Sequence, residues 1–574
     1  MKNLLLSCQF FAPGLANYKR PHVVFILADD LGWDDVGWAN EKVNTPVLDK
    51  LRENSIELDQ YYVQQVCTPS RAALMTGKAL SDPLRPPTRR DQTRRARRSP
   101  LREVLLPRGF KECGYTTQMF GKWHLGYYTK AHLPQNRGFD RFFGFYLGSQ
   151  DFYFHRTGFK TDKSFWREAA TQEELEKVNH ERLGPASYLE NFSQGLPSPD
   201  ERTALPAGYD FREAYSNGEE IIRHDAWGHY STNVLINDAI EQLKRHEGVE
   251  IPFFHFLSMQ DPHVPKQRPI RLEKAVERFN LAEKRKTFVT KVKSMDLEIG
   301  RYIDALKETN HYNNTIIIFS SDNGGSRSKG ACNWPLRGGK GSIFDGAFRS
   351  RAASHSRTGI QKYPHMFHAV DWMPTLMELL NCKLPRAHLP LDGVSHLKTL
   401  LGMNEKAPRE EMLLDIDPGP PGKNLCKVIE EGTTDARDFS FTKNEGFDFR
   451  MRAALRFKDW KIITGPPCSG PRCGVQTDTR NYLGLEEFVS NERGVRLYNI
   501  TADPREAFDL SDKHPWITKQ LLMRLCKYHK EQSQFVDREG SLEAHPETSA
   551  HVWKPWRETE INDEAHQDYM KRIN

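Results

Sequence analysis

Residues 22–30 read His-Val-Val-Phe-Ile-Leu-Ala-Asp-Asp, an almost unbroken apolar run that ends in two adjacent carboxylates. A run without polar alternation is typical of a strand that is buried on both faces of a parallel sheet. Thr45 and Pro46 then predict the start of a helix that continues through Leu48 and Leu51. A buried strand followed by a helix is the first half of a βαβ unit, so this segment predicts an α/β protein.

The same alternation continues along the chain. Further strands are expected at 116–120, 252–258 and 315–321, and helices near 232–244, 289–307 and 369–380. This pattern predicts a doubly wound, mostly parallel sheet with helices on both faces. It defines a large domain over residues 21–400.

After about residue 400 the sequence becomes richer in proline and glycine. Short strand-like runs lie at 452–457 and 460–464, and a helical pattern lies near 516–528. We therefore expect residues 401–574 to form a smaller C-terminal α+β subdomain with a short antiparallel sheet and a helix.

The composition excludes several classes of protein. With 574 residues, 38% of them hydrophobic and 11% aromatic, the chain can bury a large core and is neither disordered nor a disulfide scaffold. Its net charge of +6 is local, because residues 85–102 contain eight arginines and one aspartate. That run lacks interleaved aromatic residues, so we predict no nucleic-acid partner. No apolar stretch approaches the roughly 20 residues that cross a bilayer, so no transmembrane segment is expected.

Several features are compatible with secretion. Residues 1–20 are a candidate signal peptide, because Lys2 precedes a short apolar run and small residues. Asn191, Asn313 and Asn499 lie in glycosylation sequons. Nine cysteines are too few for a disulfide framework in a chain of this length, and the odd number leaves at least one thiol unpaired.

Polar residues follow four of the predicted strands. These are Asp29-Asp30, Gly121-Lys122-Trp123-His124, Gln260-Asp261-Pro262-His263 and Asp322-Asn323-Gly324-Gly325. Each alone has a structural explanation as a helix cap, a tight turn or a surface group. Together they would meet at the carboxyl edge of the sheet, where ligands bind. Adjacent buried carboxylates need a compensating cation, and oxygen ligands favour Ca²⁺ or Mg²⁺ over Zn²⁺.

One further motif carries a family resemblance. Residues 67–77 read Cys-Thr-Pro-Ser-Arg-Ala-Ala-Leu-Met-Thr-Gly, which resembles the sulfatase signature C-x-P-S-R followed by apolar residues and T-G. Residues 114–124 resemble the second signature of that family, with Phe120 bulkier than usual. On residues 333–340, 453–466 and 551–556 the chain looks closest to the arylsulfatase B subfamily, the N-acetylgalactosamine-4-sulfatase type. The resemblance implies an alkaline-phosphatase-like fold and hydrolysis of sulfate esters.

The resemblance also implies the chemistry. The formylglycine-generating enzyme would oxidise Cys67 to formylglycine in the endoplasmic reticulum. One hydroxyl of the hydrated aldehyde would attack sulfur, and the other would later expel sulfate. The implied ligands of one Ca²⁺ are Asp29, Asp30, Asp322 and Asn323, together with the modified Cys67. The implied groups around the nucleophile are Arg71, Lys122 and His124, with His124 as the group that takes its proton. His263 and Lys340 would lie on the leaving-group side, with His263 as proton donor.

The implied substrates are dermatan or chondroitin sulfate, or an aryl sulfate. The implied location is the lysosome, or secretion, by way of the endoplasmic reticulum. A disulfide between Cys426 and Cys468 is also implied.

Two segments depart from the family pattern. Residues 79–100 and 347–360 are rich in arginine and serine where the family has other sequence, and neither 84–100 nor 348–358 is expected to add much core. They are either a lineage-specific insertion or a reading frame that slips and recovers, and we favour the second. The anomalies leave open an inactive, sulfatase-like glycan-binding protein. A phosphate-ester hydrolase of the alkaline-phosphatase superfamily is the chemical alternative, but that class uses serine or threonine and two zinc ions.

Overall fold

The structure of the protein is a computed structural model. It describes residues 20–79, 103–127, 129–153, 155–157, 208–226, 228–355, 361–383, 390–416, 451–468, 494–531 and 552–555.

A ten-stranded sheet forms the centre of the large domain. Its order is β12-β2-β11-β10-β1-β9-β3-β4-β7-β8. The middle five strands are parallel: β10 (Thr315–Ser321), β1 (His22–Ala28), β9 (Phe253–Ser258), β3 (Thr116–Lys122) and β4 (Arg141–Phe145). One flank holds β11 (Ala352–His355), β2 (Ser55–Tyr62) and β12 (Lys362–His368), and the other holds β7 (Arg212–Tyr215) and β8 (Glu220–Ile222). The predicted mostly parallel sheet is therefore confirmed.

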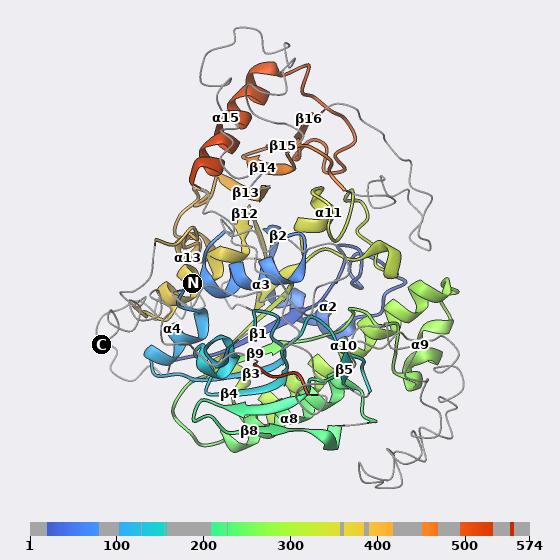
Figure 1. The fold of residues 1–574 in the computed structure, drawn as a ribbon, viewed down its shortest axis with the longest axis vertical. Coiled ribbons are helices and arrows are strands. Elements are labelled where there is room, and N and C mark those ends of the chain that lie inside the picture. Colours follow the sequence, from blue (N-terminus) through green and yellow to red (C-terminus); the bar gives the residue numbers. More distant parts are fainter. Residues whose placement is uncertain are drawn as a thin grey trace.

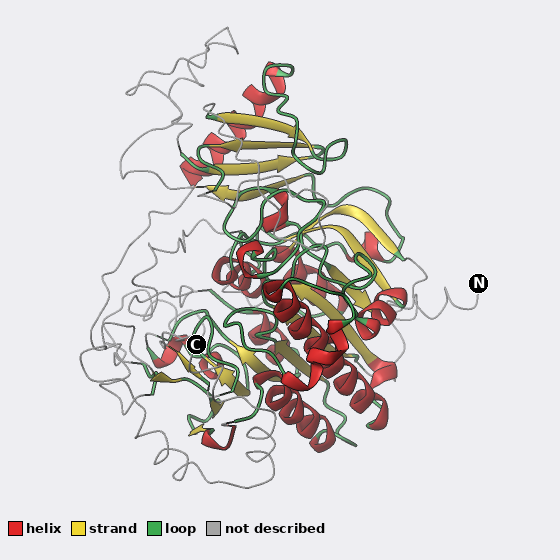
Figure 2. Ribbon diagram, turned by 90° about the vertical axis from the view of Figure 1, so that its right-hand side faces the viewer, coloured by secondary structure: helices red, strands yellow, loops and turns green. Residues whose placement is uncertain are grey.

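Helices cover both faces of this sheet (Figures 1 and 2). One set contains α2 (Pro46–Glu53), α8 (Ser231–Arg245) and α10 (Glu283–Glu308), and the other contains α3 (Cys67–Thr76), α4 (Leu106–Glu112) and α12 (Trp372–Leu379). Strand β1 sends Val23 and Phe25 into one core and Val24 and Ile26 into the other, all of them fully buried. The continuous apolar run therefore reflects burial on both faces, as predicted.

The C-terminal subdomain has its own antiparallel sheet. This sheet consists of β13 (Glu411–Ile416), β14 (Ala453–Phe457), β15 (Trp460–Thr464) and β16 (Val495–Asn499). Helix α15 (Pro515–Glu531) packs beside it at one end of the molecule (Figure 1). Trp553 lies outside this subdomain and joins the core of the large domain, where its carbonyl accepts a hydrogen bond of 2.6 Å from Arg212.

The expectation that 348–358 adds little core is wrong for its first half. Residues 352–355 form β11, which lies between β10 and β2 and is antiparallel to both. Two small residues, Ala352 and Ala353, are buried there. The guanidinium of Arg351 lies 3.8 Å from the ring centre of Trp33 and donates to the carbonyl of Trp33. Small side chains and a stacked arginine thus let a polar-looking segment occupy a sheet interior. Residues 80–102 lie outside the described residues.

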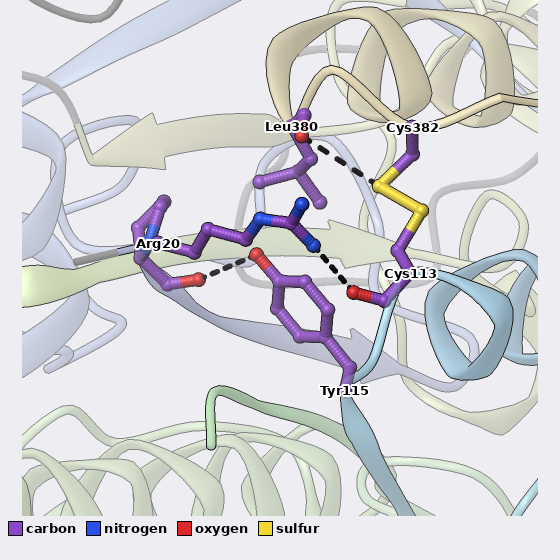
Figure 3. Close-up of a disulfide and its surroundings, with 6 residues drawn as sticks. Arg20, Cys113, Tyr115, Leu380 and Cys382 are labelled. Atoms are coloured by element: carbon purple, nitrogen blue, oxygen red, sulfur yellow. Dashed lines mark hydrogen bonds between the residues drawn. A yellow bond between two sulfur atoms is a disulfide. The ribbon is translucent and has the colours of Figure 1, made fainter. Parts of the chain in front are cut away.

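A disulfide joins two distant parts of the large domain. Cys113 and Cys382 are 269 residues apart and link the end of α4 to the segment after α12 (Figure 3). Beside it, Arg20 donates to the carbonyl of Cys113 and Tyr115 donates to that of Pro21. The sequence did not predict this pair. Cys468 is also disulfide-bonded, but its predicted partner Cys426 lies outside the described residues, so that pairing stays a prediction.

The features linked to secretion are only partly covered. Asn313 is exposed and Asn499 is half-buried, whereas Asn191 and residues 1–19 lie outside the described residues. In the part of the chain that the structure describes, no helix has the length and apolar character needed to span a membrane.

Candidate active site

The carboxyl ends of the central strands bring the predicted residues together. Ala28 and Ser321 are register partners on β1 and β10, so Asp29 and Asp322 follow side by side. The backbone N–H of Asp29 donates to the carbonyl of Asp261, which ties in the loop after β9. Lys122 is the last residue of β3. Three separate strand ends thus supply charged groups to one site, as the sequence analysis predicted.

Cys67 occupies the first position of α3 and is 4% exposed. Its Sγ lies 3.4 Å from Oδ1 of Asp29 and 3.1 Å from Nζ of Lys340. Burial, together with the negative charges of Asp29 and Asp322, raises the pKa of the Cys67 thiol to about 12. An unmodified Cys67 is therefore a neutral thiol at physiological pH, and it is a poor nucleophile.

Two buried cations hold the carboxylates beside Cys67. Arg71 lies one turn further along α3 and donates from Nε to Oδ2 of Asp322 at 3.0 Å. It also donates to the carbonyl of Lys122 at 2.9 Å and to Oγ of Ser258 at 2.5 Å. The ammonium of Lys122 lies 2.6 Å from Oδ2 of Asp29. The positions of helix α3, β3 and β10 are therefore coupled through charge-assisted hydrogen bonds.

Asp30 has its own hydrogen-bonding and charged neighbours, distinct from those of Asp29. Its Oδ1 accepts from Nδ2 of Asn323 at 2.7 Å and from Nζ of Lys340 at 2.5 Å. Nε2 of His263 is 3.8 Å from its Oδ2. Nδ1 of His263 lies 2.8 Å from the carbonyl of Val264, so this nitrogen carries the proton and Nε2 faces Asp30.

His124 lies next to the start of α3. Its Nδ1 is 3.2 Å from Oγ1 of Thr68, the residue after Cys67. Asp30 and His124 both have positive φ angles, of 67° and 57°. Non-glycine residues in this region are uncommon and often mark functional sites.

The charges of the site balance locally. Burial would raise the pKa of Asp29, but His263, Lys122, Arg71 and Lys340 outweigh it and hold that pKa well below its usual value. Burial likewise would lower the pKa of Lys340, but the acidic groups around it raise the pKa well above its usual range. Asp29 and Lys340 therefore stay ionised. Burial lowers the pKa of His263 to about 4, whereas burial and the charge of Asp29 raise the pKa of Asp322 to about 6.

The donor set fits a divalent cation. Ligand atoms of Asp29, Asp30, Cys67 and His263 all lie within 4.8 Å of one another. Oδ1 of Asn323 is fully buried and has no hydrogen-bond partner among the described residues. A buried acceptor without a donor is costly, and a cation would satisfy it. Carboxylate and amide oxygens are ligands that Ca²⁺ and Mg²⁺ prefer.

Several residues that were not predicted from the sequence hold the strand ends and the loop after β9 in place. Ser258, the last residue of β9, accepts from Arg71 and donates to the carbonyl of Lys122. Asp261 accepts from Tyr230 and Thr232 at the start of α8, both at 2.7 Å. Lys291 on α10 reaches the loop that carries His263. A lysine between two buried valines, Val289 and Val292, was the one available signal for this role.

Comparisons with known proteins identify the family. The family model "Sulfatase" matches residues 21–382. The chain is 33% identical to arylsulfatase J of Mus musculus over 563 residues, which cover 95% of this chain and 82% of the relative. The chain belongs to the sulfatase family. It is accordingly a sulfuric ester hydrolase, which favours the sulfatase interpretation over the phosphate-ester alternative.

Other relatives of this sulfatase carry the names of different sulfatases. It is 29% identical to arylsulfatase A of Homo sapiens over 426 residues, covering 72% of this chain and 73% of the relative. It is 26% identical to N-acetylgalactosamine-6-sulfatase of Canis lupus familiaris, covering 67% and 66%. None of these three relatives is named as a 4-sulfatase.

Solved structures support the alkaline-phosphatase-like fold. The structure of Ps i-CgsB in complex with k-i-k-neocarrahexaose matches with a TM-score of 0.63 and 25% identity, covering 90% of this chain and 94% of that chain. A phosphonate monoester hydrolase of Agrobacterium radiobacter matches with a TM-score of 0.50 and 19% identity, covering 90% and 96%. The second likeness concerns the fold alone.

Proposed function

We propose that this sulfatase cleaves sulfate esters with a formylglycine derived from Cys67 and one Ca²⁺. We further propose that its natural substrates are N-acetylgalactosamine 4-sulfate units of dermatan or chondroitin sulfate. The observation that carries the proposal is the position of Cys67, buried at the start of α3 between Asp29 and Lys340.

The protonated state of the Cys67 thiol supports the proposal that Cys67 acts after conversion to formylglycine. A thiol whose pKa is raised to about 12 cannot serve as a thiolate near neutral pH. Once modified and loaded with Ca²⁺, the site would supply a hydrated aldehyde as nucleophile and a Lewis acid for the sulfate oxygens. Asp29, Asp30, Asp322 and Asn323 are the residues that would hold the cation.

The cationic side chains have separate tasks. Arg71 and Lys122 fix the carboxylates of Asp322 and Asp29 and so keep the start of α3 in place. Lys340 faces Sγ of Cys67 and is placed to neutralise a sulfate group bound there. A sulfate ester gains negative charge on its departing oxygen in the transition state, which a fixed cation stabilises.

The two histidines near residue 67 contact different residues. His124, next to Thr68, is the candidate for taking a proton from the hydroxyl at residue 67. His263, near Asp30 and Lys340, is the candidate for giving a proton from Nε2 to the leaving oxygen. This donation requires the imidazolium form, because Nδ1 already donates to the carbonyl of Val264. Such a division needs two groups rather than one, because proton removal and donation occur at opposite ends of the sulfur.

Several observations support maturation in the secretory pathway. The Cys113–Cys382 disulfide is typical of an oxidising compartment. Asn313 is exposed in a short 3-10 helix, Tyr312–Asn314, and is accessible to glycosylation. The proposed location is the lysosome or the extracellular space, reached through the endoplasmic reticulum, where the formylglycine-generating enzyme would act on Cys67.

The proposal is tested with protein secreted from a cell that makes formylglycine. Peptide mass measurement should show residue 67 without its sulfur, and the protein should release the phenol from 4-methylumbelliferyl sulfate. C67A should fold and lack this activity. Equal rates for C67A and the wild type would refute the proposed nucleophile.

The substrate is tested separately. Oligosaccharides that end in N-acetylgalactosamine 4-sulfate should lose sulfate faster than the matched 6-sulfates. A preference for the 6-sulfates would refute the 4-sulfatase assignment while leaving the nucleophile intact. Activity on neither would leave an aryl sulfatase with a different natural substrate.

A further inference from the structure

Lys291 is a buried cation that the proposed chemistry does not use. It lies in the middle of α10 and is 2% exposed. Its Nζ donates to the carbonyl of His263 and, at 2.9 Å, to that of Pro265. It also lies 4.0 Å from the ring centre of Phe152. Among the described residues no carboxylate oxygen lies within 4.0 Å of this ammonium, so its near partners are two backbone carbonyls and a ring.

Such a placement is costly for stability alone. Removing an ammonium from water costs several kcal/mol unless close charges compensate. The residues one turn away on the same face of α10, Phe288 and Met295, are buried and apolar, so an apolar side chain would suit this position. The charges of Asp261, Asp29 and Asp30 compensate this cost in part, and both hydrogen bonds of the ammonium go to the loop after β9.

The loop has a separate anchor on each side of His263. Before it, the carboxylate of Asp261 accepts from Tyr230 and Thr232. After it, Lys291 holds the carbonyls of residues 263 and 265. The intervening carbonyl, that of Val264, is the one that accepts from Nδ1 of His263. The direction of that carbonyl determines which way the imidazole ring turns.

We propose that Lys291 is a positioning residue that fixes the backbone at residues 263–265 and thereby aims Nε2 of His263 at the leaving group. This inference rests on the role proposed above for His263. Lys291 itself touches neither the sulfate site nor Cys67. Loss of its ammonium should free the 263–265 backbone and let the imidazole turn away from Asp30.

A double-mutant cycle tests this inference with secreted, formylglycine-containing protein and an aryl sulfate. K291M keeps the length of the side chain but removes the donor. Because a 1 Å misplacement of a reacting group costs about 100-fold, kcat should fall by about 10- to 100-fold while KM changes little. H263A should lower kcat by about 100-fold. In the H263A background, K291M should have almost no further effect, since Lys291 acts through His263.

K293M is the matched control. Lys293 lies two residues away on the same helix and bonds to Asn44 rather than to the loop. Its kcat should stay within about twofold of the wild type. Equal losses in K291M and K293M would show a general effect of α10 and overturn the inference.

The remaining outcomes are also decisive. Multiplicative losses in the double variant would show that Lys291 acts independently of His263 and would overturn the inference. If K291M does not fold, K291L, which also lacks the donor and the buried charge, carries the same cycle. Failure of the proposed function is distinct, because it appears as equal activity of C67A and the wild type. In that case the activity measured in the wild type does not depend on residue 67 and is not the reaction proposed for His263. The positioning role of Lys291 is then refuted as well.

Discussion

The contact between the two domains contains a buried acid whose ionisation should destabilise the protein. Lys461 of β15 lies 2.7 Å from Asp345 and 2.8 Å from Glu506, and all three side chains are fully buried. Tyr62 of β2 donates to the same aspartate at 2.7 Å. Burial would raise the pKa of Asp345, but Lys461 and Arg456 hold it below its usual value. One cation is thus shared between an ionised aspartate and Glu506.

Glu506 is the group that titrates. Burial raises its pKa from 4.5 to about 7, although Lys461 opposes this shift. Because the folded state binds the proton more tightly than the unfolded state, the associated stability is fully present below pH 4.5. It is lost as the pH rises through 7. At about 1.4 kcal/mol per pKa unit, the shift corresponds to a loss of at most about 3 kcal/mol.

The substitution E506Q removes the titration and keeps an acceptor for the backbone N–H of Asp345, which in the wild type donates to Oε2 at 2.6 Å. Thermal unfolding of the wild type and E506Q, followed by calorimetry between pH 5 and 8, measures the difference. We expect E506Q to gain stability relative to the wild type as the pH rises. The exposed control E405Q should follow the wild type throughout. Parallel curves for E506Q and the wild type would refute the reasoning.

Other parts of the molecule lead to three more predictions. K461M removes the cation that Asp345 and Glu506 share, so the free energy of unfolding should fall by about 3–5 kcal/mol, measured by calorimetry at neutral pH against an exposed control such as K513M. Dialysis against EGTA should lower the melting temperature and the sulfatase rate, and added Ca²⁺ should restore both. In N323A this recovery should need a higher Ca²⁺ concentration than in the wild type. Recovery at the same Ca²⁺ concentration would contradict Asn323 as a ligand. His22 packs against His246 and His311. Burial and repulsion by these two histidines lower the pKa of His22 to about 3. The stability that neutral His22 contributes is therefore present above pH 6.5 and is lost as the pH falls through 3. H22F should therefore resist acid unfolding better than the wild type in a pH-melting series, and identical acid midpoints would contradict this.

The sequence predicted the elements whose pattern is set by local burial. The strands at 22–28 and 315–321 were predicted with the bounds that the structure has, because strands buried on both faces are continuously apolar. Strand β11 was missed because its burial depends on Trp33 and on neighbouring strands, which lie far away in the sequence. The Cys113–Cys382 disulfide was missed for the same reason, since no local signal records a contact across 269 residues.

The site was predictable as a set of residues but not as a geometry. The rule that parallel strands end at one edge is enough to group Asp29, Lys122 and Asp322 from the sequence alone. It could not show that Lys122 binds Asp29 while Arg71 binds Asp322. The same rule could not identify Lys291, because the sequence of a helix does not indicate which loop packs against it.

The left-handed residue at the end of β1 explains how two adjacent carboxylates serve one site. In a strand that continues, successive side chains point to opposite faces, so Asp29 and Asp30 could not both face Cys67. The positive φ of Asp30 ends the extended conformation, and Asp29 then contacts Lys122 while Asp30 contacts Lys340. A left-handed non-glycine residue costs about 1–3 kcal/mol, which the charge-assisted contacts of Asp30 can offset. Strain at this position is therefore the condition for placing both carboxylates beside residue 67, and the strand itself supplies the rigid support.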